Sequence, residues 1–175
     1  MRIVKILIFL LIFSSALFAE SVKIGYVDMQ KIIFNSNLGK QARQKLMEFH
    51  QKKQAEIDKK QSEIEKLKDE IAKKGAFLSQ EAREEKENRL TKLQIELKRF
   101  IEDARAEERD MESKLVNKIL TKAFKVIQKI GKEQNYTLIL MRRSGMGDPL
   151  VLYGNPSVDL TDEVIKRLNK ETAKK

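Results

Sequence analysis

Apolar residues in the middle of this chain recur at seven-residue steps, in mirror order about Phe77. The residues that follow this pattern are Ile57, Ile64, Ile71, Leu90, Leu97, Ala104 and Met111. Apolar residues at heptad spacing are typical of coiled-coil helices. A turn near Phe77 brings Ile64 level with Leu90 and Ile57 level with Leu97. The sequence therefore predicts a long antiparallel helical hairpin, which is a projecting arm and not the core of a compact enzyme.

The seam between the two predicted helices is only partly apolar. His50, Lys53 and Lys60 occupy seam positions of the first helix. Because a lysine stem can cover apolar surface while its amine stays in water, we expect an arm that forms but is loosely packed and can bend. The apolar seam and tip residues are Ile57, Ile64, Leu67, Ile71, Phe77, Leu78, Leu90, Leu93, Leu97 and Phe100.

The predicted tip of the arm lies near residues 75–79. Gly75 suits the end of the first helix, and Ser79 suits the N-cap of the second. Phe77 and Leu78 either fold back to close the hairpin or contact a partner. We expect the second helix to span residues 80–130 and to stop at Gly131.

The predicted base of the arm is small and strand-rich. Residues 21–27, 136–141 and 150–153 have strand character. A short helix capped by Asp28 follows the first strand, and a final helix begins at Thr161. So small a body with open strand edges and no cysteine is expected to need self-assembly. The residues expected in the oligomerising strands are Ile24, Tyr26, Val27, Leu138, Ile139, Leu140 and Val151.

The predicted fold class is therefore α+β, with a long antiparallel α-helical hairpin projecting from a small β-strand body. The arm spans residues 39–114, and the discontinuous body comprises residues 20–38 and 115–175. A broad apolar face from Leu115 onward indicates where the second helix enters the body.

Residues 1–19 have the layout of a secretory signal peptide, with a basic start, a short apolar stretch and small residues near a cleavage site. Cleavage after Ala19 and after Ala16 both fit, and a retained membrane anchor is the alternative. The chain contains no cysteine, which excludes lipoprotein anchoring, disulfides and thiol catalysis.

Positive charge is unevenly distributed along the chain, whose formal net charge is +10. Residues 40–74 contain 11 basic and 7 acidic side chains, whereas residues 111–132 contain 6 and 1. Such runs are either solvated helix faces or a surface for an acidic partner or anionic lipid. The arm lysines that could steer such a partner are Lys52, Lys53, Lys59, Lys60, Lys73 and Lys74.

No residue pattern indicates an enzyme or a cofactor site. His50 is the only histidine, so a site with paired imidazoles is excluded and a catalytic triad has no spare base. Gly145 and Gly147 lack the third glycine and the following helix of a nucleotide-binding loop. We therefore expect no catalytic residues, no metal and no cofactor.

Two motifs flank the charged hairpin and resemble the Skp/OmpH family of periplasmic chaperones. The matching segments are residues 23–31 (KIGYVDMQK), Gly39 with Lys40, and residues 158–169 (VDLTDEVIKRLN). The resemblance implies a homotrimer with a shared β-body, whose arms surround a cavity. It also implies an ATP-independent holdase that keeps unfolded outer-membrane proteins from aggregating in the Gram-negative periplasm.

The seam residues would then serve both hairpin cohesion and contact with the unfolded protein. Contact with anionic membrane lipid is a further expectation from the charge. A basic coiled-coil spacer or adaptor of the cell envelope is the alternative function. A nucleic-acid-binding protein is disfavoured, because acidic residues are interspersed along the same helices and no groove-reading motif is present.

Overall fold

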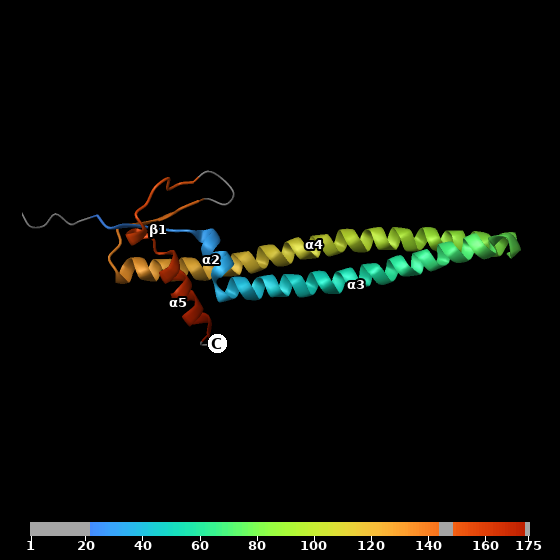
Figure 1. Cartoon of the computed structure of the whole chain (residues 1–175), viewed down its shortest axis with the longest axis horizontal. Helices are drawn as coiled ribbons and strands as arrows, with labels where there is room; N and C mark the ends of the chain where they lie inside the picture. Colours follow the sequence, from blue (N-terminus) through green and yellow to red (C-terminus); the bar gives the residue numbers. More distant parts are fainter. Residues whose placement is uncertain (1–21, 144–148, 174–175) are drawn as a thin grey trace, which may run out of the picture.

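The structure, a computed structural model, describes residues 22–143 and 149–173. Its elements in chain order are β1 (Ile24–Val27), α2 (Met29–Asn35), α3 (Asn37–Lys74), η2 (Gly75–Phe77), α4 (Gln80–Glu133), β2 (Leu138–Met141), η3 (Pro156–Val158) and α5 (Thr161–Ala173). Helices α3 and α4 form a long antiparallel hairpin, and the other elements except the tip turn η2 gather at its open end (Figure 1). The predicted hairpin on a small body is confirmed. The predicted signal peptide lies outside the described residues.

The joint between α2 and α3 is built from local side-chain caps. The carboxylate of Asp28 accepts a hydrogen bond from the Lys31 amide at 3.1 Å and caps α2. The hydroxyl of Ser36, which is fully buried, accepts one from the Gly39 amide at 3.1 Å. A Cβ atom on Gly39 would lie 1.7 Å from the carbonyl oxygen of Ile33. Only glycine therefore fits this turn, where the chain enters the arm.

The arm turns at η2 and re-enters a helix at Ser79. The Ser79 hydroxyl accepts a hydrogen bond from the Ala82 amide at 3.3 Å, as expected for an N-cap. Phe77 does not fold back, because 89% of its surface is exposed, while Leu78 is half-buried. Phe77 is therefore exposed at the tip and does not close the hairpin.

Helix α4 does not stop at Gly131 as predicted. It continues to Glu133, and Asn135 then adopts a positive φ of 55°. Asparagine tolerates this left-handed conformation better than most residues do. The Lys23 ammonium also donates to the carbonyl oxygen of Gln134 at 3.0 Å. The helix therefore ends where its last carbonyl groups find partners, and not at the glycine.

β1 and β2 form a two-stranded parallel sheet, in which Ile24 pairs with Leu138 and Tyr26 with Leu140. The predicted third strand at residues 150–153 is wrong for the single chain. Its start lies beside Arg142, whose carbonyl oxygen accepts from the amides of Leu150 at 3.0 Å and of Val151 at 3.3 Å, and an isolated bridge joins Arg143 to Pro149. No continuous partner strand lies beside it among the described residues. The apolar residues of this segment therefore do not form a β-ladder in the single chain.

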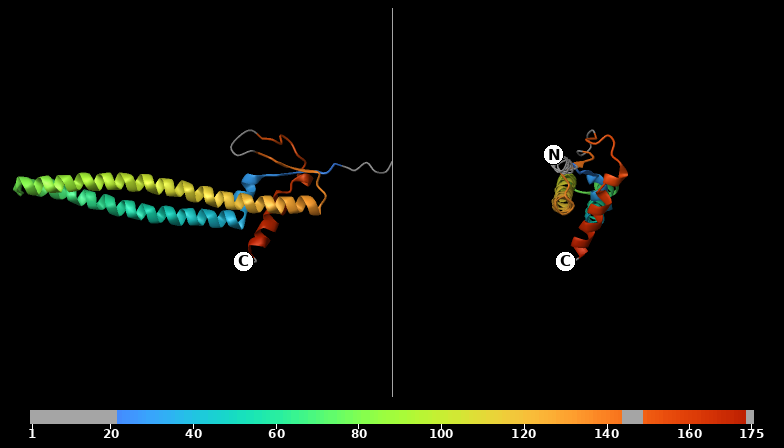
Figure 2. Two further views of the ribbon diagram at one scale, coloured as in Figure 1. Left: turned by 180° about the vertical axis from the view of Figure 1, so that it is seen from behind. Right: turned by 90° about the vertical axis from the view of Figure 1, so that its left-hand side faces the viewer.

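The core of the body lies between the sheet and three helices. Its buried members are Val27, Met29, Ile32, Ala123, Val126, Ile130, Leu160, Val164 and Leu168. They come from β1, α2, α4, and α5 with the residue before it. Helix α5 crosses α4 steeply (Figures 1 and 2). The broad apolar face predicted from Leu115 onward on α4 therefore packs on several neighbours, as expected.

An arginine on α5 ties that helix to the end of α4. Arg167 forms ion pairs with Glu133 of α4 and with Glu163 of α5, the latter at 2.7 Å. The hydrogen bond from Arg167 lowers the pKa of the Glu133 carboxyl below its ordinary value. The body is thus fastened to the base of the arm by charge as well as by apolar packing.

Candidate functional site

An open groove with an apolar floor runs along one flank of the arm. The part of it nearer the tip has a volume of about 630 Å³. Ile64 of α3 with Leu97 and Ile101 of α4 form the floor of this part. Charged and amide side chains form its rims, namely Gln61, Glu65, Lys68, Gln94, Lys98, Glu102 and Arg105. We call this surface the arm groove.

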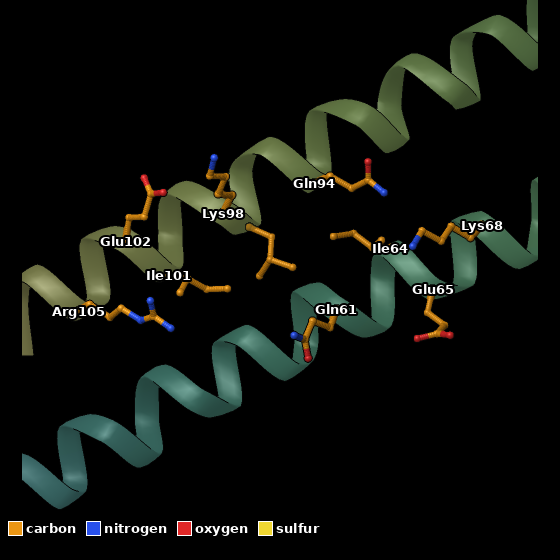
Figure 3. Close-up of a pocket in the computed structure, with 10 residues that line it drawn as sticks. Gln61, Ile64, Glu65, Lys68, Gln94, Lys98, Ile101, Glu102 and Arg105 are labelled. Atoms are coloured by element: carbon orange, nitrogen blue, oxygen red, sulfur yellow. The ribbon is translucent and has the colours of Figure 1, made fainter.

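Figure 3 shows how the side chains of the arm groove are directed, with Arg105 of α4 reaching into the space between the two helices. Ile64 and Ile101 extend into the space between α3 and α4. Glu65 and Glu102 point away from that space. An extended chain lying here would therefore meet apolar atoms below it and charges of both signs beside it.

The arm groove continues towards the body. A neighbouring hollow of about 320 Å³ is lined by His50, Ile57 and Ala104, and shares Gln61, Ile101 and Arg105 with the first. The shared residues make the two hollows one surface. From His50 to Lys68 this surface is about 27 Å long, at about 1.5 Å of helix per residue.

A second groove lies at the root of the arm on the other flank of the seam. It has a volume of about 680 Å³, and Phe49, Met111 and Leu115 form its floor. The rim residues are Lys45, Glu48, Lys52, Glu107, Asp110 and Lys114. We call this surface the root groove. Like the arm groove, the root groove has an apolar floor and rims that carry charges of both signs.

Lysine side chains fill part of the seam beside Phe100. The ammonium groups of Lys53 and Lys60 lie 5.1 Å and 5.6 Å from the centroid of the Phe100 ring. Lys53 also pairs with Glu107 at 2.8 Å, and this hydrogen bond is the largest cause of its raised pKa. Both lysines therefore lie in the seam and pack on an aromatic ring, whereas loose packing and bending of the arm stay predictions.

Other ion pairs between α3 and α4 stand at the edges of the arm. Glu63 pairs with Arg89 at 3.3 Å and Glu70 with Lys86 at 3.1 Å. Exposed pairs of this kind contribute about 1 kcal/mol or less each. Their partners lie at roughly equal distances along the chain from Phe77, so they support the register that the mirrored heptads predict.

The sheet of the body presents a second apolar surface. Ile24 of β1 is 46% exposed, and Leu138 and Leu140 of β2 are 48% and 39% exposed. Alternate strand residues share a face, so these three side chains lie on the face opposite the core residue Val27. Tyr26 lies on the same face but is buried, because its ring packs against Gly154 and its hydroxyl donates to the Gly154 carbonyl oxygen at 3.3 Å. The rest of this face is apolar and uncovered, which is typical of an assembly surface.

Comparison with known protein families identifies the chain. The profile of the family described as outer membrane protein (OmpH-like) matches residues 23–168. This chain belongs to the OmpH-like family. The match includes the first motif segment, the whole hairpin and residues 158–168 of the second motif segment.

A solved structure shows the same fold as this OmpH-like chain. It is the crystal structure of a candidate outer membrane chaperone (OmpH-like) from Caulobacter crescentus. The two chains share 20% sequence identity and superpose with a TM-score of 0.78, over 85% of this chain and 84% of the other. A comparison with curated proteins gives no match.

The sequence-predicted seam residues of the OmpH-like chain fall into three groups by exposure. Ile64 and Leu67 are buried, and Phe77 stands exposed at the tip. The half-buried group consists of Ile57, Ile71, Leu78, Leu90, Leu93, Leu97 and Phe100. Of the predicted seam, Ile57, Ile64 and Leu97 line the arm groove. Most seam residues thus hold the hairpin together while leaving part of their surface accessible.

The six lysines predicted to steer a partner fall into two groups by exposure. Lys53 and Lys60 are half-buried against Phe100. Lys52, Lys59, Lys73 and Lys74 are exposed. Within this exposed group, Lys73 pairs with Asp69 at 3.4 Å, and the other three form no salt bridge with a described residue.

Three floor residues were missed as candidates in the sequence analysis. Ile101 follows Leu97 by four residues and precedes Ala104 by three, so its helical spacing could have identified it. Phe49 and Leu115 line the root groove, but their spacing does not continue the heptad through Ile57 and Leu97. Only the packing of α3 beside α4 brings them together.

Neither a metal-ligand cluster nor a membrane-spanning helix is found among the described residues. Among residues 22–143 and 149–173, no group of three or more His, Cys, Asp or Glu side chains is placed to hold a metal ion. Among the same residues, no helix is both long and apolar enough to cross a membrane.

Proposed function

We propose that this OmpH-like chain is an ATP-independent holdase chaperone. It binds unfolded outer-membrane proteins in the periplasm of a Gram-negative bacterium and prevents their aggregation before membrane insertion. The observation that carries the proposal is the arm groove, an open surface with an apolar floor and rims of both charges. The proposed activity contains no chemical step and needs no cofactor.

The shape of the grooves suits a chaperone that must later release its client, the unfolded protein. Full burial of one large apolar side chain contributes about 1.5–3 kcal/mol. A shallow groove buries each client side chain only in part, so each contact contributes less. Several weak contacts along the arm groove and the root groove add to a useful affinity, and the client can still leave by breaking them one at a time.

We propose further that three chains assemble through their bodies. The exposed face formed by Ile24, Leu138 and Leu140 needs a cover, and β2 has an outer edge that can accept a strand. Residues 150–153, which include the half-buried Val151 and the 88% exposed Leu152, could supply part of that strand. In such a homotrimer three arms surround the space in which the client is held.

Export is part of the proposal, because the clients are themselves exported. Residues 1–19 carry the predicted signal peptide, with cleavage near Ala19 or Ala16. Processing can be checked by N-terminal sequencing of the protein recovered from the periplasm. A mature chain that begins shortly after either residue is the expected result, and a retained N-terminus would contradict it.

A light-scattering assay tests the holdase function. An outer-membrane β-barrel protein is diluted from urea with and without near-equimolar trimer, in the absence of ATP. Suppressed aggregation is expected. Unchanged aggregation would favour an envelope spacer, whereas tight binding of duplex DNA at physiological salt without any effect on aggregation would favour a nucleic-acid-binding protein.

Charge on the exposed arm lysines is expected to accelerate client capture. Substitution of Lys52, Lys59, Lys73 and Lys74 by glutamate should slow capture of an acidic client about tenfold at low salt, because electrostatic steering is lost. Stopped-flow fluorescence of a labelled client measures the rate across a salt series. The same four positions changed to arginine keep the charge and should leave the rate unaltered. An unchanged rate and salt dependence in the glutamate variant would show that these lysines do not steer.

A further inference from the structure

Two cationic side chains stand at opposite ends of the floor of the arm groove. Lys68 lies one helical turn beyond Ile64 on the tip side, and Arg105 lies one turn beyond Ile101 on the body side. Because the side chains of an α-helix lean towards its N-terminus, Lys68 of α3 leans towards the body and Arg105 of α4 leans towards the tip. Figure 3 shows the two side chains directed over the floor from its two ends. The two cations therefore frame the apolar floor.

Neither cation is neutralised by an acidic side chain of the groove. Both are exposed, and neither forms a salt bridge or a side-chain hydrogen bond with another described residue. The acidic rim residues Glu65 and Glu102 point away from the groove (Figure 3). Glu108, three residues after Arg105, lies 3.5 Å from His50 instead. Among the described residues, the two cations are thus left without an acidic partner.

The spacing of the two cations suits an extended chain. The ion pair between Lys53 and Glu107 brings these residues level across the arm, so Arg105, two residues before Glu107, lies level with about residue 55 of α3. Lys68 is then about 20 Å nearer the tip, at about 1.5 Å per residue. An extended chain advances about 3.3 Å per residue, so about six residues span this length and fewer span the charged groups, which lean together.

We propose that the arm groove selects extended client segments in which apolar residues are flanked by a carboxylate at each end. The apolar side chains lie on the floor, and the carboxylates accept hydrogen bonds from the Lys68 ammonium and the Arg105 guanidinium. An arginine fork can bind a carboxylate through two parallel hydrogen bonds. A segment with basic ends would bring like charges together and bind less well. This inference rests on the proposed function, because it names the segments that the holdase would bind.

This selectivity differs from steering by the exposed lysines elsewhere on α3. Steering raises the rate at which any acidic client arrives, wherever its carboxylates stand. The two groove cations act on the bound segment and require carboxylates at its ends. The position of the charges in the segment therefore distinguishes selection from steering.

Photo-crosslinking from within the groove measures the selectivity. In the full chain, a photoreactive residue replaces Gln61, which lines the groove between the two cations. Three short peptides of alternating leucine and serine carry glutamate, glutamine or lysine at both ends, on the same side of the extended chain as the leucines. At low salt and below saturation, the glutamate peptide should give about fivefold more crosslink than the glutamine peptide, and the lysine peptide should give the least.

Charge reversal at the two cations should reverse this order. When Lys68→Glu is combined with Arg105→Glu, the lysine peptide should give the most crosslink and the glutamate peptide the least. The matched control combines Lys66→Glu with Arg99→Glu, which makes the same change of charge at exposed positions that do not line the groove. This control should keep the order of the natural chain. Circular dichroism checks that both variants keep their helices.

A glutamate preference that reverses only in the groove variant would support the proposal. Equal yields from the three peptides with the natural cations in place, or no crosslink to any of them, would overturn it. An unchanged glutamate preference in the groove variant, or a reversal in the control variant as well, would also overturn it. Aggregation of an outer-membrane β-barrel protein is measured in parallel, so the holdase function can fail or hold independently of the selectivity.

Discussion

Replacing Gly39 with alanine is expected to lower the free energy of unfolding of the body by about 3 kcal/mol or more. The added Cβ would meet the Ile33 carbonyl oxygen at 1.7 Å and its carbon at 2.9 Å. Both atoms belong to the backbone of α2, so relief requires the α2–α3 joint to move. That joint holds the buried Ser36 and the core residue Ile32. Thermal unfolding followed by circular dichroism should show a fall in Tm of more than about 10 °C.

Gly131 provides the matched control for this substitution. It lies within α4, and a Cβ there would lie 3.5 Å from the side chain of Ile139, an ordinary van der Waals contact. Gly131→Ala is expected to be neutral or to stabilise by up to about 1 kcal/mol, because alanine favours a helix more than glycine does. Equal melting temperatures for Gly39→Ala and the natural chain would contradict the described α2–α3 joint.

Replacing Leu138 with glutamate is expected to dissociate the proposed homotrimer and abolish aggregation suppression. The uncovered sheet face would become an interface in the trimer, and burying an unpaired carboxylate there costs several kcal/mol. The dissociation constant should rise at least about a hundredfold. Sedimentation equilibrium at micromolar concentration measures the mass, and the light-scattering assay measures the activity.

Ile95→Glu is the control for this change, because Ile95 lies on the arm and is 48% exposed, as is Leu138. It should leave the mass of the assembly unchanged. A trimer with full activity in Leu138→Glu would show that the exposed sheet face does not hold the chains together.

The hairpin could be predicted from the sequence because its signal is local and repeated. Heptad spacing on either side of Phe77 defines both the helices and their register. The caps at Asp28 and Ser79 are likewise local, since each side chain bonds an amide three residues away. These features need no knowledge of distant parts of the chain.

Most of the errors concern features that depend on distant residues. Gly131 predicts a helix end, but the actual end is held by Lys23, which lies more than a hundred residues earlier. Residues 150–153 have strand composition, but in the single chain only the amides of Leu150 and Val151 bond the neighbouring segment, at Arg142, and no ladder forms. A helical wheel could have identified Ile101 as a groove residue. The root groove could not be predicted, because it requires the packed positions of α3 and α4.

Site-specific photo-crosslinking tests most directly whether the arm groove binds the client. A photoreactive residue is placed at Gln61, which lines the groove, or at Ser62, which is exposed one helical position away. Each full-length variant is mixed with an unfolded outer-membrane β-barrel protein and illuminated. We predict strong crosslinks from position 61 and weak ones from position 62. Equal yields from both positions, or crosslinks from position 62 alone, would contradict the proposal that the arm groove holds the client.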